Sequence, residues 1–294
     1  MGESLIPAVA APPPPSPPDQ VVGAVPELLP DQPREPRVWG LSRPIQVTSA
    51  WVGCLAGTVC RSLRPVGWLA TRILGAWVLI SALVVLTLRW VDPPASSFMV
   101  RQALVGWRAD RKPPYYHHQW VPWRELPPEL PLALIAAEDQ RFPVHHGFDP
   151  VEIKRAISTY RRGGVLRGAS TITQQTAKNL FLWPQRSWLR KGLEAWFAAL
   201  IELFWPKQRI LEVYLNIVQF SPSTYGVRAA SERYFRLPVR DLTLREASLL
   251  AGVLPAPGAY RLDRPSARLE RRAAWIADQT QRIGGRRYLA RLKG

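Results

Sequence analysis

Residues 167–182 read RGASTITQQTAKNLFL, and no other stretch of the 294-residue chain is as informative about its fold. Thr171 is followed three residues later by Gln174, which fits a capping box at the start of a helix. We expect a helix that begins here and continues to Leu182. Gly168 is expected to loosen the chain just before this helix.

The start of this expected helix is dense in polar side chains. A helix N-terminus presents unpaired N–H groups and partial positive charge, which suits a phosphate. Ser170, Thr173 and Lys178 add further donors around it. Two interpretations follow from the spacing alone: a phosphate-binding site, or a capped surface helix without a ligand.

The net charge of the chain is +17, and it is unevenly distributed. Residues 1–60 hold five acidic and three basic side chains, so their net charge is −2 and residues 61–294 carry +19. A strongly basic body implies an anionic partner such as nucleic acid, anionic lipid or a phosphorylated substrate. Because the sequence has no zinc-finger spacing and no aromatic RNA-binding motif, we exclude nucleic acid as that partner.

The first 60 residues differ in composition from the rest. Residues 1–36 contain eleven prolines, far above an average usage of roughly 5%, and they predict a disordered cytoplasmic tail. Such a tail either solubilises the chain or serves as a proline-rich ligand for a partner. Residues 45–60 are weakly apolar, and we expect them to lie at the membrane interface. Cys54 and Cys60 are the only cysteines, so no disulfide or cysteine metal site is expected beyond them.

Residues 66–90 are long and apolar enough for a transmembrane helix, since about 20 residues cross the hydrocarbon core. A buried helix of a soluble core is the alternative. The arginines before the segment, the tryptophans within it and Asp92 after it favour the membrane. Because the basic flank is N-terminal, we expect a single span with a cytoplasmic N-terminus and residues 91–294 on the outer side.

After Pro93 the sequence repeats helical patterns and has few alternating strand runs, which predicts a mostly α domain over residues 95–290. Residues 130–138 are rich in alanine and leucine and follow a proline-rich start signal. Thr243 and Glu246 fit a second capping box, whose helix should end before the proline at position 255.

Two further expected helices show apolar stripes at three- and four-residue spacing. The helix at 188–204 carries Leu189, Leu193, Trp196, Phe197, Leu200 and Phe204. The next helix carries Ile210, Leu211, Tyr214 and Leu215. The short apolar stripes leave enough surface for a hydrophobic patch near the membrane.

Glu138 ends its alanine-rich helix and lies beside Asp139. A helix C-terminus is partially negative and a neighbouring carboxylate is a like charge, so both should raise the pKa of Glu138 toward the range of a general base. A solvated pair of surface carboxylates is the alternative interpretation.

A basic cluster precedes a second carboxylate. Arg186, Arg190 and Glu194 are spaced i, i+4 and i+8, with Lys191 close by, and we expect them along one edge of the helix at 188–204. The row is either a surface ion-pair series, which would contribute only ~0–1 kcal/mol per pair, or an anion-binding site.

Beside GASTITQQTAKN at 168–179, further blocks recur in the order of a known family. They are AAEDQRFPVHHGFD at 136–149, RSWLRKGLEA at 186–195, KQRILEVYLN at 207–216 with YGVRAASERYF at 225–235, and LTLREASLLAGVLPAPGAY at 242–260. Over roughly residues 95–290 the chain resembles the peptidoglycan glycosyltransferases, glycosyltransferase family 51. It looks like a monofunctional, membrane-anchored member.

The resemblance implies a lysozyme-like fold of two helical lobes behind one transmembrane helix in the bacterial inner membrane, with the catalytic domain in the periplasm. It implies transfer of a growing glycan chain from polyprenyl diphosphate to the 4-hydroxyl of lipid II, giving β-(1→4)-linked strands. The implied partners are lipid II, the lipid-linked nascent glycan, the membrane, and proteins of cell wall synthesis or division. A lysozyme-like lytic enzyme is the alternative, since glycosidases also use two carboxylates.

The same resemblance implies roles for residues. Glu138 is the general base and Glu194 the second catalytic carboxylate, while Phe142 packs and His145 positions its loop. The residues assigned to substrate binding are Asp139, Phe142, His145, Gly147, Ser170, Thr171, Thr173, Gln174, Gln175, Lys178, Asn179, Arg186, Arg190 and Lys191. Among them, the diphosphate would be held by Lys178, Arg186, Arg190 and Lys191. No cofactor is required, although Mg²⁺ or Mn²⁺ at the diphosphate is compatible with the chemistry.

Two places depart from the family pattern. Residues 221–223 read Ser-Pro-Ser where glycine is usual, and Arg236-Leu237 stands where Gly-Lys is usual. Neither place carries a carboxylate of the expected site, so the departures concern loop conformation rather than the class of reaction.

Overall fold

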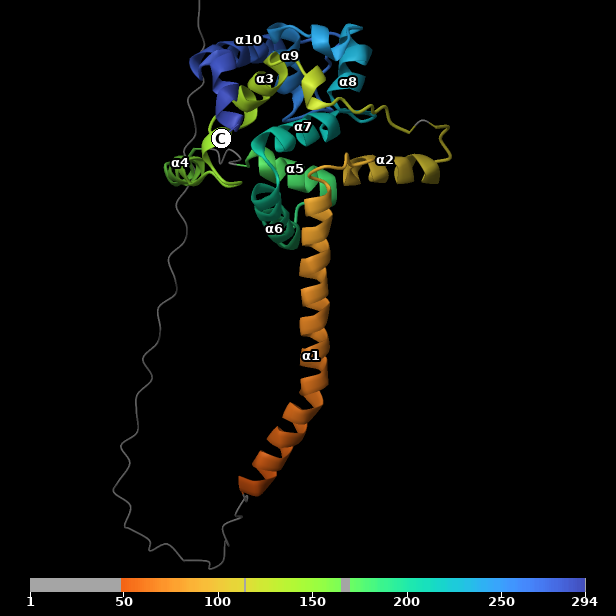
Figure 1. Ribbon diagram of the computed structural model, residues 1–294, viewed down its shortest axis with the longest axis vertical. Helices are drawn as coiled ribbons and strands as arrows, with labels where there is room; N and C mark the ends of the chain where they lie inside the picture. The colour runs from red at the N-terminus through yellow and green to blue at the C-terminus, as the bar shows by residue number, and fades with distance from the viewer. Residues whose placement is uncertain (1–48, 114, 165–169, 294) are drawn as a thin grey trace, which may run out of the picture. The chain divides into compact units, whose positions relative to one another are not determined.

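The protein is described by a computed structural model covering residues 49–113, 115–164 and 170–293, with side chains from Trp68 to Leu292 in these ranges. Helices dominate these residues (Figure 1). Chain contacts divide the protein into two units, Met1–Cys60 and Arg61–Gly294, and every element after the first helix lies in the second unit. The expectations for the proline-rich tail and for Gly168 fall outside the described residues.

The elements run in the following order. The α-helices are α1 (Ser49–Thr87), α2 (Ser97–Arg108), α3 (Glu129–Glu138), α4 (Pro150–Arg161), α5 (Ile172–Phe181), α6 (Trp188–Phe204), α7 (Lys207–Ile217), α8 (Val227–Ala230), α9 (Leu244–Val253) and α10 (Ala267–Arg282). Short helical turns are η1 (Trp123–Glu125), η2 (Phe142–Val144), η3 (Ser231–Phe235), η4 (Val239–Asp241) and η5 (Gly285–Lys293). The two strands are β1 (Gln219–Ser221) and β2 (Thr224–Tyr225), which pair antiparallel.

Helix α1 contains the expected apolar segment. Its part Trp68–Thr87 is 20 residues long and apolar enough to cross a membrane. The helix begins at Ser49, well before the expected start of the span at residue 66, so residues 49–60 are helical and continuous with it. Their location at the membrane interface stays a prediction.

The C-terminal end of α1 is fixed by side chains of α7 and of the turn before it. The Arg209 guanidinium donates to the carbonyl oxygens of Leu88 and Val91, and the indole Nε1 of Trp205 donates to the Val85 carbonyl at 2.7 Å. These bonds satisfy carbonyls that a helix end leaves without intrahelical partners. The apolar helix is therefore joined to the globular part by buried polar contacts.

The globular part contains two groups of helices. Helix α3 packs against α9 and α10, while α5 packs against α6 and α7 (Figure 1). Residues 130–136 of α3 are all buried, so this helix is apolar around its whole circumference and forms the centre of its group. The C-terminus of α3 and the N-terminus of α5 come together through the contacts of Asp139 described below.

The predicted helix starts are confirmed. Thr171 is the N-cap of α5, and its hydroxyl and the Gln174 amide close the expected capping box. Thr243 and Glu246 close the second box at the start of α9, which ends before Pro255. Both boxes satisfy backbone N–H groups that the first turn of a helix leaves unpaired, which is why this short pattern predicts a boundary well.

The apolar stripe of α6 is only partly buried, and the predicted place of Arg186 on this helix is wrong. Leu189, the first residue of the apolar stripe, is 69% exposed, whereas Arg190 and Glu194 lie on the buried face with Ala198 and Ile201. Arg186 also precedes the N-cap residue of α6, so it is not on the helix. The periodicity located the helix, but it could not show that an ion pair packs inward while part of the apolar stripe stays exposed.

The apolar stripe of α6 packs on the core from Trp196 to Phe204, while its first residue, Leu189, is exposed. Trp196 packs on Trp77 of α1 with ring centroids 5.4 Å apart, and Phe197 stacks on Phe181 of α5 at 4.5 Å. Leu203, beyond them, is exposed like Leu189.

The two departures from the family pattern have distinct structural outcomes. Ser221 and Thr224 pair across a tight turn between β1 and β2, and the Ser221 hydroxyl donates to Thr224 Oγ1 at 2.9 Å. Arg236 has φ +57° and lies in the left-handed region, where a side chain is strained and glycine is not. The left-handed backbone at this position therefore explains why glycine is usual here in the family pattern.

Arg236→Gly is expected to stabilise the protein. Left-handed backbone costs a non-glycine residue roughly 1–2 kcal/mol, and the larger freedom of glycine in the unfolded chain offsets about half of this gain. We expect a net gain of about 0.5–1 kcal/mol and a rise in Tm of roughly 1–4 °C, measured in detergent. Arg240→Gly, in the nearby turn η4, is the control and should lower Tm, because Arg240 is not among the residues with positive φ. A fall in Tm for Arg236→Gly would show that its side chain supports the loop.

Candidate functional site

Glu138 is the last residue of α3, as the sequence predicted, and its side chain is only 14% exposed. Its Oε2 accepts a hydrogen bond from Gln175 Nε2 of α5 at 2.9 Å. Its Oε1 lies 3.9 Å from Nη2 of Arg272 in α10. The carboxylate therefore receives donors and charge from two other helices.

The pKa of Glu138 is raised, and burial is the main cause. The hydrogen bond from Gln175 and the charges of Arg272 and Lys178 lower this pKa, while Asp139 adds a smaller upward contribution. The predicted direction is thus confirmed, but desolvation rather than the neighbouring carboxylate is the leading cause. A buried carboxylate with a raised pKa is suited to accept a proton near neutral pH.

The partner of Gln175 is Tyr214, whose hydroxyl donates to Gln175 Oε1 at 2.9 Å. Tyr214 is fully buried in α7, and its pKa is raised well above that of an ordinary tyrosine, first by burial and then by the charge of Glu138. The three side chains form one hydrogen-bonded series from α7 through α5 to α3.

The second carboxylate, Glu194, is buried with two cations. Its Oε2 accepts from Arg190 Nη1 at 2.8 Å, and its Oε1 accepts from the Lys191 ammonium. Arg190 is also buried and donates from Nε to the Gln185 carbonyl at 2.9 Å, whereas the Lys191 side chain is 45% exposed. Arg190 and Glu194 are therefore not part of an exposed surface row, whereas solvent reaches the Lys191 side chain.

Lys178 lies within the electrostatic influence of both carboxylates. Burial lowers the pKa of its ammonium, the charges of Glu194 and Glu138 raise it, and those of Arg190 and Lys191 lower it. All of these residues were predicted from the sequence to belong to the site. In the structure their charges lie close enough to shift the pKa of Lys178. Arg186 is exposed beside this group.

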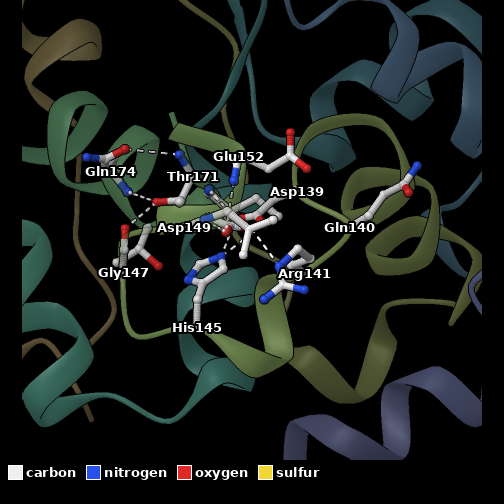
Figure 2. Close-up of polar contacts among 12 residues, drawn as sticks. Asp139, Gln140, Arg141, His145, Gly147, Asp149, Glu152, Thr171 and Gln174 are labelled. Atoms are coloured by element: carbon white, nitrogen blue, oxygen red, sulfur yellow. Dashed lines mark hydrogen bonds and ion pairs between the residues drawn. The ribbon is translucent and has the colours of Figure 1, made fainter. Parts of the chain in front are cut away.

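Asp139 contacts His145 and the start of α5 (Figure 2). Its carboxylate accepts from His145 Nε2 at 2.9 Å and from the backbone N–H of Ile172 at 3.0 Å. The backbone N–H of Gln174 is bound to the Thr171 hydroxyl. The N-terminus of α5 therefore binds a carboxylate of the protein itself. From the sequence, a phosphate was one of the two interpretations for this position.

The other residues near the start of α5 are also engaged. Thr173 is fully buried and its hydroxyl donates to Glu202. The Thr171 hydroxyl donates to the carbonyl of Gly147, which has φ +79°. A Cβ at Gly147 would approach Glu202 Cγ to 2.9 Å, so both backbone conformation and space require glycine there.

Phe142, His145 and Asp149 complete this region as packing and hydrogen-bonding residues. Phe142 is fully buried and meets the His145 ring edge-on at 6.1 Å between centroids, as expected for a packing residue. Asp149 caps α4 by accepting from the backbone N–H of Val151 at 2.9 Å, and it also accepts from Arg141 Nε at 3.0 Å.

Asp139, His145 and Asp149 place donor atoms within 4.8 Å of one another, a spacing that can suit a metal ion. In the structure both carboxylates accept hydrogen bonds from protein donors, Asp139 from His145 and Asp149 from Arg141 (Figure 2). The arrangement ties the end of α3 to the starts of α4 and α5. We assign it a structural role.

A cavity of about 390 Å³ opens beside Glu138, between residues of α3, α4 and α10. Ser170, Arg155 and Trp275 lie on its walls. Its size is that of a site for a small organic group such as a sugar. Asn179, also predicted to bind substrate, is buried, and its backbone carbonyl accepts from Ser97.

Sequence reasoning missed Tyr214, Arg272 and Trp275. Tyr214 was counted only as an apolar residue of α7, and the other two stand on α10, for which no site residue was predicted. A buried tyrosine usually needs a hydrogen-bond partner, and that requirement was the available signal for Tyr214.

The chain is similar to known transglycosylases. A family model described as Transglycosylase matches residues 109–281. A Biosynthetic peptidoglycan transglycosylase of Stutzerimonas stutzeri is 51% identical over 218 residues, which cover 74% of this chain and 90% of that protein. A protein of the same name from Xanthomonas axonopodis pv. citri is 47% identical over 242 residues, covering 82% of this chain and 98% of that protein. Another from Xylella fastidiosa is 50% identical over 212 residues, covering 72% and 87%.

Proposed function

The chain belongs to the transglycosylase family, as a peptidoglycan glycosyltransferase of cell wall synthesis, and we propose that it polymerises lipid II into β-(1→4)-linked glycan strands. The single observation that carries the proposed chemistry is the pairing of a buried carboxylate, Glu138, with a separate cationic group around Glu194. Lys178 couples the two electrostatically.

The reaction moves the growing glycan from a polyprenyl diphosphate to the 4-hydroxyl of lipid II. The donor bond is α and the product bond is β, so a single displacement with inversion needs a base on one face of the sugar and charge stabilisation on the other. In the proposed mechanism Glu138 takes the proton of the attacking hydroxyl. Oε2 is held by Gln175, and Oε1, 3.9 Å from Arg272, is the oxygen that accepts the proton.

The leaving diphosphate is proposed to bind Lys178, Arg190 and Lys191, because charge-assisted hydrogen bonds to phosphate are among the strongest that side chains make. Glu194 holds Arg190 and Lys191 in place. We therefore propose that Glu194 acts on the leaving group through these two cations. Arg186, exposed just before α6, is proposed as an outer contact.

A divalent cation does not fit the side chains around Glu194. Its single negative charge is already paired with the two positive charges of Arg190 and Lys191, so this cluster is net positive and repels a divalent cation. We propose a reaction without a required cofactor, in which the three cations supply the charge that a metal would otherwise supply.

We also propose an arrangement of the helices in two lobes and a location in the inner membrane. The two helix groups, α3 with α9 and α10, and α5 with α6 and α7, support a lysozyme-like arrangement in two lobes, with Glu138 contributed by one lobe and Glu194 by the other. The apolar part of α1 and exposed apolar side chains of α6 such as Trp188 support a single-pass protein of the inner membrane with a periplasmic catalytic domain. Its proposed partners are lipid II, the lipid-linked nascent glycan and the membrane, with synthesis or division proteins as further partners.

One observation also suits a lytic enzyme. A glutamic acid whose pKa is raised by burial can donate a proton to a glycosidic oxygen, as in glycosidases. Such an enzyme has no use for a cationic diphosphate site, which is why we favour synthesis.

The test is incubation of the detergent-solubilised full-length protein with labelled lipid II. We expect polymer to form with release of polyprenyl diphosphate, and to form in the presence of EDTA as well. Isolated peptidoglycan incubated with the same protein should remain intact. Release of soluble muropeptides without polymer from lipid II would support the lytic enzyme instead.

A further inference from the structure

The hydrogen-bonded series from Tyr214 through Gln175 to Glu138 has a direction. The tyrosine hydroxyl donates to the amide oxygen of Gln175, and the amide nitrogen of Gln175 donates to the carboxylate. All three side chains are buried or partly buried and come from α7, α5 and α3. The series therefore connects a fully buried hydroxyl to one oxygen of the carboxylate.

A glutamine amide can turn over and exchange its oxygen for its nitrogen, and the two orientations have opposite effects on Glu138. With nitrogen toward the carboxylate, the amide stabilises the ionised form. With oxygen toward it, two acceptors face each other unless the carboxyl is protonated. The orientation of Gln175 therefore decides which protonation state of Glu138 is favoured.

Tyr214 determines that orientation. Its hydroxyl is buried and stays protonated across the physiological range, because burial raises its pKa. A hydroxyl that points to the amide finds an acceptor only when the oxygen of Gln175 faces it, which leaves the nitrogen for Glu138. If the amide turned over, its nitrogen could donate to the Tyr214 oxygen, but the buried hydroxyl proton would lose its acceptor among the described residues, and the amide oxygen would face the carboxylate.

We propose that Tyr214 is a positioning residue that, through Gln175, holds Glu138 in its ionised, proton-accepting form. This inference rests on the proposed role of Glu138 as the general base. It gives Tyr214 a role beyond its packing in the core of α7.

Other charged groups also face Glu138, and they stay in place when Tyr214 is changed. Arg272 of α10 and Lys178 of α5 favour the ionised carboxylate, and the adjacent Asp139 opposes it. An effect of Tyr214 on the protonation of Glu138 must therefore pass through Gln175, the residue that contacts both.

The experiment compares pH profiles of kcat/KM for lipid II polymerisation by the full-length protein in detergent. In Tyr214→Phe the acid limb should move to higher pH by about one unit, which is about a tenfold loss on that limb, while the rate at high pH recovers to near the wild-type value. Gln175→Leu, which removes the hydrogen bond to Glu138 itself, should move the limb at least as far. The double variant should show no additional shift over Gln175→Leu, because both changes act on one series.

Tyr225→Phe is the matched control. Tyr225 is a second buried tyrosine, in β2, and its pKa is raised to about 12, mainly by burial. Among the interactions of the described residues, its hydroxyl does not enter the series to Glu138. Its loss should leave the position of the acid limb unchanged.

The outcomes separate this proposal from the one it rests on. If Tyr214→Phe lowers the rate by the same factor at every pH, or changes only Tm, the tyrosine is a packing residue and the proposal fails while the function stands. Additive shifts in the double variant would also overturn it. If Glu138→Gln polymerises lipid II at the wild-type rate, the assignment of the base fails and the role of Tyr214 fails with it.

Discussion

Replacing Glu138 with glutamine is expected to reduce the rate of glycan polymerisation by roughly 10²–10⁴-fold, the usual loss when a general base is removed. Glutamine has nearly the same shape and keeps an oxygen that can accept the hydrogen bond from Gln175, so the local geometry should persist. The amide cannot take up the proton of the attacking hydroxyl. The loss should appear in kcat, measured with labelled lipid II at saturating concentration.

The same substitution should not destabilise the protein at neutral pH. Burial raises the pKa of Glu138 above its value in the unfolded chain, so the folded state favours the neutral acid. The resulting contribution to stability is fully present below the unfolded pKa of roughly 4.3 and is lost as the pH rises through the folded pKa. Above the folded pKa the charged carboxylate therefore costs stability, and glutamine should give an equal or higher Tm.

Glu270→Gln is the control for this experiment. Glu270 is an acidic residue of α10 that pairs with Arg245 at the surface, and its loss should leave the rate unchanged. If Glu138→Gln polymerises lipid II as fast as this control, another group must be the base. Asp139 is then the nearest carboxylate, although His145 and the start of α5 already hold it.

Local sequence signals predicted the helices that position the site. The capping boxes at Thr171 and Thr243 gave the starts of α5 and α9 because a cap is formed by residues three apart, which a sequence displays directly. The start of α3 followed from the prolines there, and its end at Glu138 from the extent of the alanine- and leucine-rich stretch. Such features depend on neighbours along the chain, and neighbours are what a sequence shows.

Features that depend on contacts between distant segments were not predictable in this way. Asp139 occupies the start of α5, 33 residues away, and only the folded chain shows that this N-terminus already has its anion. Tyr214 contacts Gln175 across 39 residues. The burial of Arg190 and Glu194 was missed because charged residues rarely face a core, and spacing alone favours the apolar stripe as the buried face.

The burial of Arg190 and Glu194 predicts a second large effect. Replacing Arg190 should lower the stability of the protein far more than replacing the neighbouring Lys191. Arg190→Gln removes the buried partner of Glu194, and breaking a buried ion pair by removing one member typically costs about 3–5 kcal/mol. Tm should fall by roughly 6–20 °C. Lys191→Gln removes a half-exposed side chain from the same carboxylate, and its Tm should change little because exposed pairs contribute only ~0–1 kcal/mol.

Both variants should nevertheless weaken use of the diphosphate donor by about 1–3 kcal/mol in kcat/KM, since each loses a charge-assisted contact with phosphate. The double variant Arg190→Gln/Glu194→Gln separates the two effects. Removing the carboxylate as well eliminates a buried charge that only the half-exposed Lys191 would still pair with, so Tm should recover in part, while donor use should stay impaired because the cation is still missing. If donor use recovers together with Tm, Arg190 acts only by stabilising α6, and Lys178 and Lys191 are left as the cations that hold the leaving group.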